Sequence, residues 1–158
     1  VMRLAHDMDA GNILAQETVQ ITPETTKQSL YEALATTGAK LLVDVLPAAL
    51  EGKADEKAQD ESAATFTKPL DKSMSQLLPQ EKTAETLVCE IRAFAGFPKS
   101  KTTLFNTPCT ITEAHVSDKA ETEIDLLCSD GKYLVIDRLI PENSKPMDAK
   151  SFLNGHKK

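Results

Sequence analysis

The stretch EIDLLCSDGKYLVIDRLI, from Glu123 to Ile140, decides the fold of the C-terminal part of the chain. Its two apolar runs, Glu123–Ser129 and Lys132–Ile140, flank the dipeptide Asp130-Gly131. An Asp-Gly pair suits the positive φ angles of a tight hairpin turn, and apolar runs on both sides of such a pair are typical of paired strands. The stretch therefore predicts an antiparallel β-hairpin.

Two further strands are expected immediately before this hairpin. After Gly96 the hydrophobic pattern changes to a period of two, which favours strands at Thr102–Phe105 and Cys109–Val116. These two strands should be joined across Asn106-Thr107. Together the four strands predict a small, mostly antiparallel β-unit with the strand content of a small barrel.

A short helix is expected on each side of this β-unit. Thr83 is a suitable N-cap for the first helix, and Gly96 lies just past its end. The second helix should run from its N-cap Asp148 to Asn154 and stop at Gly155. The apolar residues that share one face of the first helix are Leu87, Val88, Ile91 and Phe94.

The N-terminal residues predict two strands joined by a turn. Val1–Ala5 and Ile13–Ile21 have strand patterns, the second with alternating apolar positions, and Asp9-Ala10-Gly11-Asn12 has the composition of a turn. A pair of strands and one helix bury too little apolar surface to be stable alone. We therefore interpret this region as the edge of a larger α/β sheet and expect that the chain is cut inside a domain.

A long helix should follow these strands. Thr25 and Gln28 have the spacing of a capping box. Gly38 interrupts the helical pattern, and Pro47 should kink or end the helix before Glu51-Gly52 closes this part of the chain. The apolar positions of the helix are Leu30, Leu34, Leu41, Leu42, Val45 and Leu46.

The composition is that of a folded, acidic chain with a polar connection in the middle. Of its 158 residues, 41% are hydrophobic and 27% are charged, which is ordinary for a folded soluble protein. The net charge of -6 means that nucleic-acid binding would need a local basic patch. The segment from Lys53 to Gln80 is polar and highly charged, and we interpret it as a linker or an extended arm.

The three cysteines do not form the pattern of a metal site. Cys89, Cys109 and Cys128 are far apart, without CxxC spacing or neighbouring histidines, so we expect buried free thiols in a reducing cytoplasm and no metal. No apolar run approaches the ~20 residues that cross a bilayer. The first residues also lack the pattern of a signal peptide. We expect a cytoplasmic protein that does not enter a membrane.

Four segments have sequences characteristic of one enzyme family: Val1–Leu14, Gln59–Phe66, Ile91–Phe94 and Leu139–Gly155. They resemble segments of the folate-dependent formyltransferases, and together they resemble the second half of the methionyl-tRNA formyltransferase family. They occur in the family's order and extend over essentially the whole chain. The segments are specific in combination, and the tail, with Pro146-Met147 followed by Phe152-Leu153-Asn154-Gly155, favours the tRNA enzyme over a sugar-nucleotide enzyme.

The resemblance implies an α/β region followed by a β region. Residues 1–52 would be the C-terminal portion of a Rossmann-like formyltransferase catalytic domain, residues 53–82 a linker, and residues 83–158 a small OB-like β-barrel. The family transfers a formyl group from 10-formyltetrahydrofolate to the methionyl amino group of initiator tRNA, without a metal. The implied partners are therefore initiator methionyl-tRNA and the folate co-substrate, and we expect a monomer.

The resemblance also implies which residues form the site. The family's catalytic Asp maps onto Asp9, and Asp7, Met8 and Gly11 belong to the same substrate- and cofactor-binding loop. His6 does not correspond to the family's catalytic His. That His and a catalytic Asn lie upstream of the matched region in the family, so we expect this chain alone to be inactive.

The OB-like domain of the family helps to hold the tRNA, which suggests a set of basic candidates here. Two departures from the family pattern, Lys68-Pro69 and the segment near Leu78-Pro79, fall in the linker and bear on its contacts with the tRNA. Two alternatives remain open: a stand-alone RNA-binding or interaction module, and part of a sugar-nucleotide formyltransferase. The candidate tRNA-binding residues are Lys68, Arg92, Lys99, Lys101 and Lys145.

Overall fold

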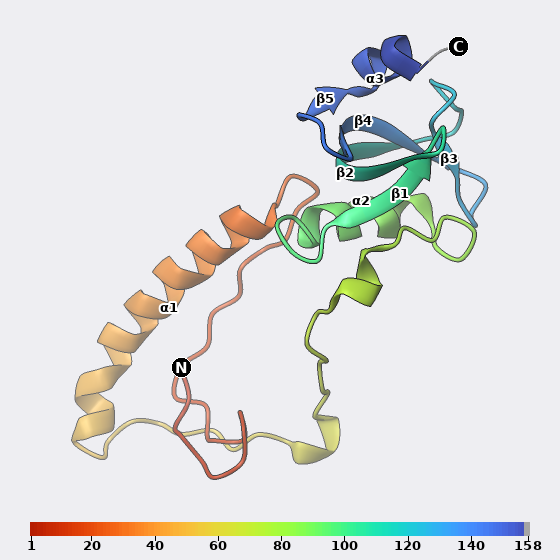
Figure 1. The fold of residues 1–158 in the computed structure, drawn as a ribbon. Coiled ribbons are helices and arrows are strands. Elements are labelled where there is room, and N and C mark those ends of the chain that lie inside the picture. Colours follow the sequence, from red (N-terminus) through yellow and green to blue (C-terminus); the bar gives the residue numbers. More distant parts are fainter. Residues whose placement is uncertain (157–158) are drawn as a thin grey trace. The chain divides into compact units, whose positions relative to one another are not determined.

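The computed structural model describes residues 1–156 and consists of two compact units. The first unit is Val1–Lys68 and the second begins at Pro69 (Figure 1). Both boundaries of the expected linker, at residues 53 and 82, remain predictions. The linker region contains two short 3₁₀ helices, η1 (Glu61–Ala63) and η2 (Lys72–Ser75).

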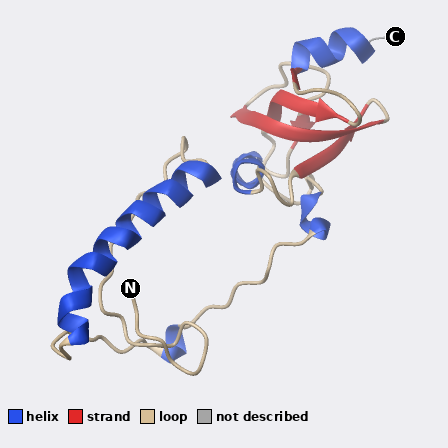
Figure 2. Cartoon of the chain, turned by 60° about the vertical axis from the view of Figure 1, so that its left-hand side comes forward, coloured by secondary structure: helices blue, strands red, loops and turns tan. Residues whose placement is uncertain are grey.

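The second unit is built around one antiparallel sheet. Its strands pair in the order β1-β2-β4-β3, and β5 pairs with β4. All named strands of the described chain lie in this unit, as Figure 2 shows. The OB-like barrel remains a prediction. The elements are α2 (Ala84–Ala93), β1 (Ser100–Leu104), β2 (Thr107–Ser117), β3 (Leu126–Leu127), β4 (Tyr133–Pro141), β5 (Met147–Asp148) and α3 (Ala149–His156).

The hairpin predicted around Asp130-Gly131 is present. Leu127 of β3 pairs with Tyr133 of β4, and Gly131 has φ 78°. Strand β3 is shorter than the predicted run Glu123–Ser129. The Asp125 carboxylate accepts hydrogen bonds from the backbone N–H groups of Glu121 and Thr122, at 2.8 and 2.6 Å, so this part of the chain turns instead of joining the sheet.

The hairpin between β1 and β2 is also present, with its turn one residue earlier than predicted. Phe105 and Asn106 have φ angles of 45° and 61°, so the turn is Phe105-Asn106 and Thr107 already belongs to β2. Two consecutive positive φ angles are the geometry that matches the twist of a tight hairpin.

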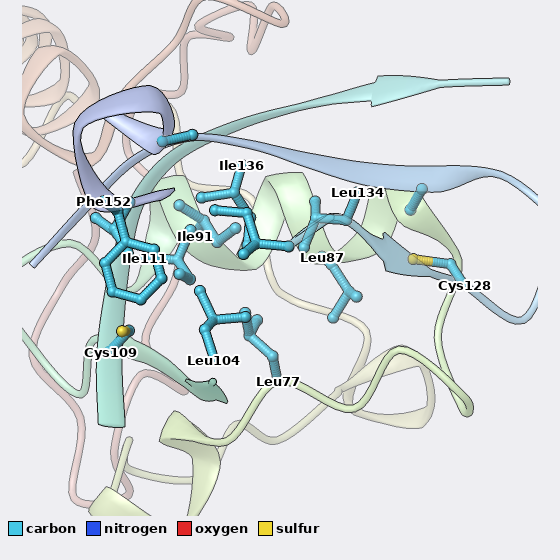
Figure 3. Packing of buried hydrophobic residues seen from close by; sticks show 14 of the residues in the cluster. Leu77, Leu87, Ile91, Leu104, Cys109, Ile111, Cys128, Leu134, Ile136 and Phe152 are labelled. Carbon is cyan, nitrogen blue, oxygen red and sulfur yellow. The ribbon is translucent and has the colours of Figure 1, made fainter. Parts of the chain in front are cut away.

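The hydrophobic core lies entirely in the second unit. Leu87 and Ile91 point from α2 into a cluster that also contains residues of β1, β2 and β4 (Figure 3). This confirms the predicted apolar face of α2 at these two positions. The largest fully buried side chains are Phe152, Leu87, Leu134, Ile136 and Leu139.

Both short helices have the predicted N-caps. The Thr83 hydroxyl accepts a hydrogen bond from the Thr86 N–H at 3.2 Å, and Asp148 Oδ1 accepts one from the Ser151 N–H at 2.7 Å. The expected stop at Gly155 was wrong, because α3 continues to His156. The His156 ring stacks on Phe152 with 4.1 Å between the centroids, which favours the extension of the helix by two residues beyond Asn154.

The long helix of the first unit is α1 (Lys27–Leu50). Its N-cap is Thr26, which forms a capping box with Ser29, one residue after the predicted pair. Gly38 does not interrupt it, and Pro47 lies inside its last turn. The helix ends where the Lys53 N–H reaches back to the Ala48 carbonyl at 2.8 Å.

Helix α1 has no buried residue in this structure. Its most apolar window has a mean hydropathy of 1.4, so by length and composition it could cross a bilayer. The prediction from sequence concerned uninterrupted apolar runs, and those of α1 are broken by Lys40 and Asp44, whereas the mean hydropathy averages over them. Apolar core helices of soluble proteins meet the same criteria, so this is weak evidence for a membrane span.

The two strands predicted at the N-terminus were wrong as strands. Only isolated antiparallel bridges form, between Met2 and Ile13 and between Ile13 and Lys57. Among the described residues no further strand borders this pair, so the ladder does not extend along Val1–Ala5 or Ile13–Ile21.

Candidate functional site

The loop from His6 to Asn12 turns sharply at Asp9 and Gly11. Asp9 has φ 57°, a left-handed conformation that Asp tolerates better than most residues. Gly11 is buried, and a Cβ atom there would lie 1.8 Å from the carbonyl oxygen of Arg3. Only glycine therefore allows the loop to pass this close to the N-terminal segment.

The loop is held in place by the segment Glu56–Gln59. The Gln59 side-chain amide donates hydrogen bonds to the backbone carbonyls of both Asp9 and Gly11, each at 2.7 Å. One oxygen of the Glu56 carboxylate accepts from Asn12 Nδ2 at 3.1 Å, and the other accepts from Arg3. The hydrogen bond from Arg3, followed by that from Asn12, lowers the pKa of Glu56.

These contacts fix the backbone of the loop and leave the Asp9 side chain exposed. Asp9 is exposed to solvent, and within residues 1–156 no hydrogen bond or ion pair holds its carboxylate. Asp7 pairs with His6 at 3.2 Å on the surface, and Met8 is 92% exposed. The structure thus brings Asp7, Met8 and Asp9 together on one open loop, whereas Gly11 lies beneath it.

Sequence reasoning missed the role of Gln59. The residue belongs to the Gln59–Phe66 segment that resembles the formyltransferases, but the resemblance did not indicate a function for it. Its side chain reaches back 50 residues along the chain to Asp9, a contact for which local sequence patterns give no signal.

The candidate basic residues fall into three places. Arg92 in the last turn of α2, Lys99 in the α2–β1 connection and Lys101 in β1 are close along one part of the second unit. Lys145 lies in the β4–β5 connection, which begins beside the start of β2, because the Glu142 N–H donates to the carbonyl of Pro108. Lys68 belongs to the first unit.

Lys99 and Lys101 are both exposed, and neither is in an ion pair within the described part of the chain. The same is true of Lys72, Lys119, Lys145 and Lys150. Other basic side chains are partly neutralised by acids on neighbouring elements. These pairs are Lys82 with Glu90, Lys132 with Glu85, and Arg138 with Glu113.

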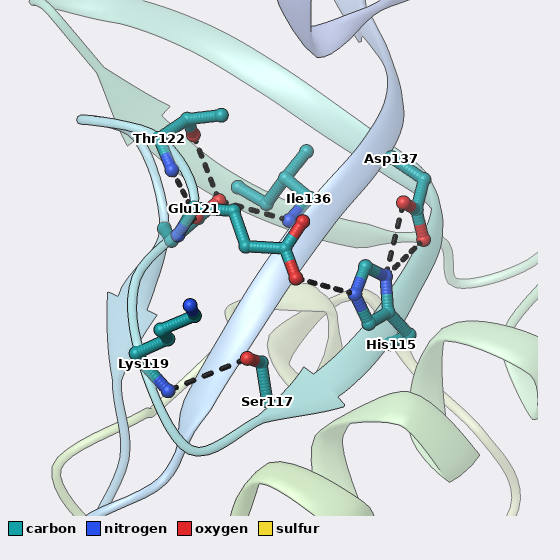
Figure 4. Close-up of polar contacts among 8 residues, drawn as sticks. His115, Ser117, Lys119, Glu121, Thr122, Ile136 and Asp137 are labelled. Atoms are coloured by element: carbon teal, nitrogen blue, oxygen red, sulfur yellow. Dashed lines mark hydrogen bonds and ion pairs between the residues drawn. The ribbon is translucent and has the colours of Figure 1, made fainter.

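His115 on β2 forms a polar cluster that the sequence did not indicate (Figure 4). Its Nδ1 lies 2.9 Å from an oxygen of Asp137, and its Nε2 lies 3.4 Å from Glu121. A register shift beside Glu113 and Ala114 places Asp137 as an extra residue on β4, which turns its side chain toward His115. The hydrogen bond that His115 Nδ1 donates to the Asp137 carboxylate is the main cause of a raised pKa of His115.

The thiols differ in exposure. Cys109 and Cys128 are buried, as expected, and burial raises the pKa of both. Cys89 is exposed on α2, so the expectation was wrong for this residue, and its sulfur lies 3.3 Å from an Arg92 nitrogen. Within residues 1–156, no group of three or more His, Cys, Asp or Glu side chains could hold a metal ion.

Two family models match the chain in order. The model described as formyl transferase, C-terminal domain, matches residues 72–157, which is more than half of the chain. The chain belongs to the formyltransferase family. The model described as formyl transferase matches residues 1–46 of this formyltransferase chain, a range that includes the Asp9 loop and most of α1.

Curated relatives that align with nearly the whole chain are formyltransferases by name. Methionyl-tRNA formyltransferase from Methylococcus capsulatus is 31% identical over 99% of this chain and 54% of its own length. The protein of the same name from Listeria monocytogenes is 28% identical over 98% of this chain and 53% of its own length. The formyltransferase chain therefore spans about half the length of the curated relatives it matches.

Solved structures agree at the level of the fold. HypX from Aquifex aeolicus in complex with tetrahydrofolic acid has a TM-score of 0.64 and 13% identity, over 99% of this formyltransferase chain and 30% of HypX. A variant of HypX has the same TM-score at 14% identity. At this identity the likeness supports the family fold of helices and an antiparallel sheet.

Proposed function

We propose that this chain is part of a methionyl-tRNA formyltransferase, which transfers a formyl group from 10-formyltetrahydrofolate to the methionyl amino group of initiator tRNA. One observation carries the proposal: both formyltransferase models match in order, and relatives of that name align with 98–99% of the chain. The reducing cytoplasm, where buried free thiols persist, is the proposed location, and a monomer is the proposed state.

Asp9 is the proposed catalytic residue of this chain. Transfer of a formyl group to an amine forms a C–N bond, breaks another, and requires the amine to lose a proton while negative charge develops on the formyl oxygen. The Asp9 carboxylate is exposed and unpaired within the described residues, on a backbone fixed by Gln59. It is therefore available to accept a proton or to orient and charge a neighbouring histidine.

The side chains of the same loop are chemically suited to bind a folate-type co-substrate. 10-Formyltetrahydrofolate would supply the formyl group. Met8 presents an exposed apolar side chain next to the Asp9 carboxylate. A flat ring system would pack against Met8, while an amine would contact Asp9. Asp7 and Met8 would contact the substrates, and Gly11 would allow the close approach of the backbone.

The second unit is the proposed tRNA-binding domain, with an OB-like barrel. Arg92, Lys99 and Lys101 lie near one another along α2, its connection and β1, and would contact phosphates. Lys145 and Lys68 are additional proposed phosphate contacts. The net charge of -6 requires such local patches, because the overall field repels RNA.

The catalytic proposal is tested with two proteins. One is the chain as it stands, and the other joins Val1 to the part of the Methylococcus capsulatus relative that precedes the matched region. We expect the chimera to formylate methionyl-tRNA and the chain alone to be inactive. Asp9→Asn in the chimera should lower kcat by about 100-fold or more, because positioned proton transfer contributes on that order.

Asp44→Asn, which makes the same chemical change, is the control, because Asp44 is an exposed carboxylate of α1, outside the His6–Asn12 loop. Circular dichroism verifies that each variant folds. Formylation by the chain alone, or an Asp9→Asn chimera with unchanged kcat, would contradict the proposal. Formylation of an amino-sugar nucleotide but not of methionyl-tRNA would favour the sugar-nucleotide alternative, and tRNA binding without any transfer would favour a stand-alone RNA-binding module.

A further inference from the structure

A small apolar cavity lies where the C-terminal end of α2 meets the sheet of the second unit. Its volume is about 200 Å³. The walls come from α2, the α2–β1 connection, and strands β1, β2 and β4. They include Ile91, Phe94, Gly96, Ser100, Ile111 and Ile140.

One polar atom in this wall lacks a partner. Ser100 is only 2% exposed, and its hydroxyl oxygen has no hydrogen-bond partner within the described residues. Buried hydroxyl groups are normally satisfied by protein, water or ligand, and a hydroxyl can both donate and accept. The cavity thus combines apolar walls with one unsatisfied hydroxyl group, which can form a hydrogen bond with the polar edge of a ligand.

The interior of the cavity and its surroundings favour ligand groups of different charge. Lys99 lines its rim and Lys101 follows in β1, and both are without an ion pair among the described residues. The interior is next to the C-terminal end of α2, where the helix dipole is negative and disfavours an anion. A neutral group therefore suits the interior, while anionic groups suit the lysines outside it.

We propose that this cavity binds one unpaired nucleobase of the bound tRNA, with the adjacent phosphates on Lys99 and Lys101. The inference rests on the proposed tRNA binding of the second unit. An unpaired base is a neutral, flat group with polar edges, joined to a phosphate on each side. Ile91 and Phe94 would contact its faces, and the Ser100 hydroxyl would form a hydrogen bond with its edge.

The first test compares two RNAs by fluorescence anisotropy. Initiator tRNA offers unpaired bases, whereas a fully paired duplex of similar length offers phosphates alone. Ser100→Ala should weaken binding of tRNA about threefold or more, as expected for one hydrogen bond, and leave duplex binding unchanged. Thr103→Ala, which removes an exposed threonine hydroxyl from the same strand, is the matched control and should change neither.

Lys99→Ala should act differently from Ser100→Ala. It should weaken tRNA and duplex equally and lower the slope of log K against log salt by about one phosphate contact. An equal loss for both RNAs in Ser100→Ala, or no loss for either, would overturn the nucleobase site.

The second test does not depend on tRNA. Adenosine, cytidine, guanosine and uridine are titrated separately into the ¹⁵N-labelled chain, and amide shifts are followed by NMR. We expect at least one nucleoside to shift the amides of Gly96, Ser100 and Thr112, and this shift should be lost in Ser100→Ala. If no nucleoside shifts these amides, the cavity holds water and the inference is wrong. If a nucleoside binds but tRNA does not, the proposed function of the second unit fails while the nucleobase site stands.

Discussion

At the scale of single residues, Gly11 controls the position of Asp9. Gly11→Ala would place a methyl group against the Arg3 carbonyl, because a Cβ there lies 1.8 Å from that oxygen. The loop must then move, and we expect the first unit to lose about 1–3 kcal/mol of stability, as for other overpacked sites. Urea denaturation and amide shifts of residues 6–12 would measure both effects.

Gly38 provides the matched control for this substitution. It lies inside α1, where an added Cβ meets nothing within 4 Å. Gly38→Ala should therefore raise helix stability by about 0.5–1 kcal/mol without moving the Asp9 loop. Identical effects of the two substitutions on the loop would show that the contact with Arg3 does not hold it.

At the scale of elements, His115 connects two strands to a loop in a pH-dependent way. Asp137 of β4 and Glu121 of the loop after β2 face its ring, and the hydrogen bond that the ring donates to Asp137 raises the pKa of His115. A raised pKa in the folded state means that the stabilisation is complete below the ordinary value of 6.5 and is lost as the pH rises through the folded-state value.

The expected outcome is a loss of this stabilisation from mildly acidic to alkaline pH. His115→Gln should remove that part of the pH dependence and leave the rest. In an NMR titration of the His115 ring, Asp137→Asn should lower the pKa more than Glu121→Gln does, since Asp137 makes the shorter contact. A larger effect of Glu121→Gln would contradict the geometry.

The sequence predicted the elements whose signals are local. The hairpin at Asp130-Gly131 and the N-caps Thr83 and Asp148 each depend on residues within a few positions of one another, and each is present. The predicted strand Val1–Ala5 does not form, because a strand needs a neighbouring strand to pair with, and a strand-like sequence pattern alone does not supply one. Pro47 lies in the last turn of α1, so the predicted end of the helix near this proline agrees with the structure, and the Lys53 N–H completes the cap.

The site was predictable to the same extent. The resemblance indicated the Asp9 loop, but the exposed state of its carboxylate remained open until the fold was known. The supports of the loop depend on contacts between distant segments, such as Gln59 with Asp9. Asp137 contacts His115 because of a register shift between β2 and β4, and no sequence motif predicts this shift.

At the scale of the whole molecule, stability is divided unequally between the two units. Every residue of the core cluster belongs to the second unit, whereas α1 of the first unit has no buried residue. We expect residues 69–158 alone to keep a cooperative thermal transition. Phe152→Ala should lower the free energy of unfolding of this unit by about 3–5 kcal/mol, because its side chain is fully buried.

Leu34→Ala in the complete chain is the control, because Leu34 is 49% exposed and an exposed substitution costs about 0.5 kcal/mol or less. Circular dichroism during urea titration would measure both variants. Loss of the transition on removal of residues 1–68 would show that the second unit depends on the first.

The unequal exposure of the thiols gives the chain a built-in attachment point for a reporter dye. A maleimide reacts with an accessible thiolate, and burial protects Cys109 and Cys128 from this reaction. The native chain should therefore take up dye at Cys89 alone. Cys89 lies beside Arg92, on the helix whose C-terminal end lines the proposed nucleobase cavity. The fluorescence of a dye on Cys89 should therefore change when RNA binds at this surface, and no engineered residue is needed.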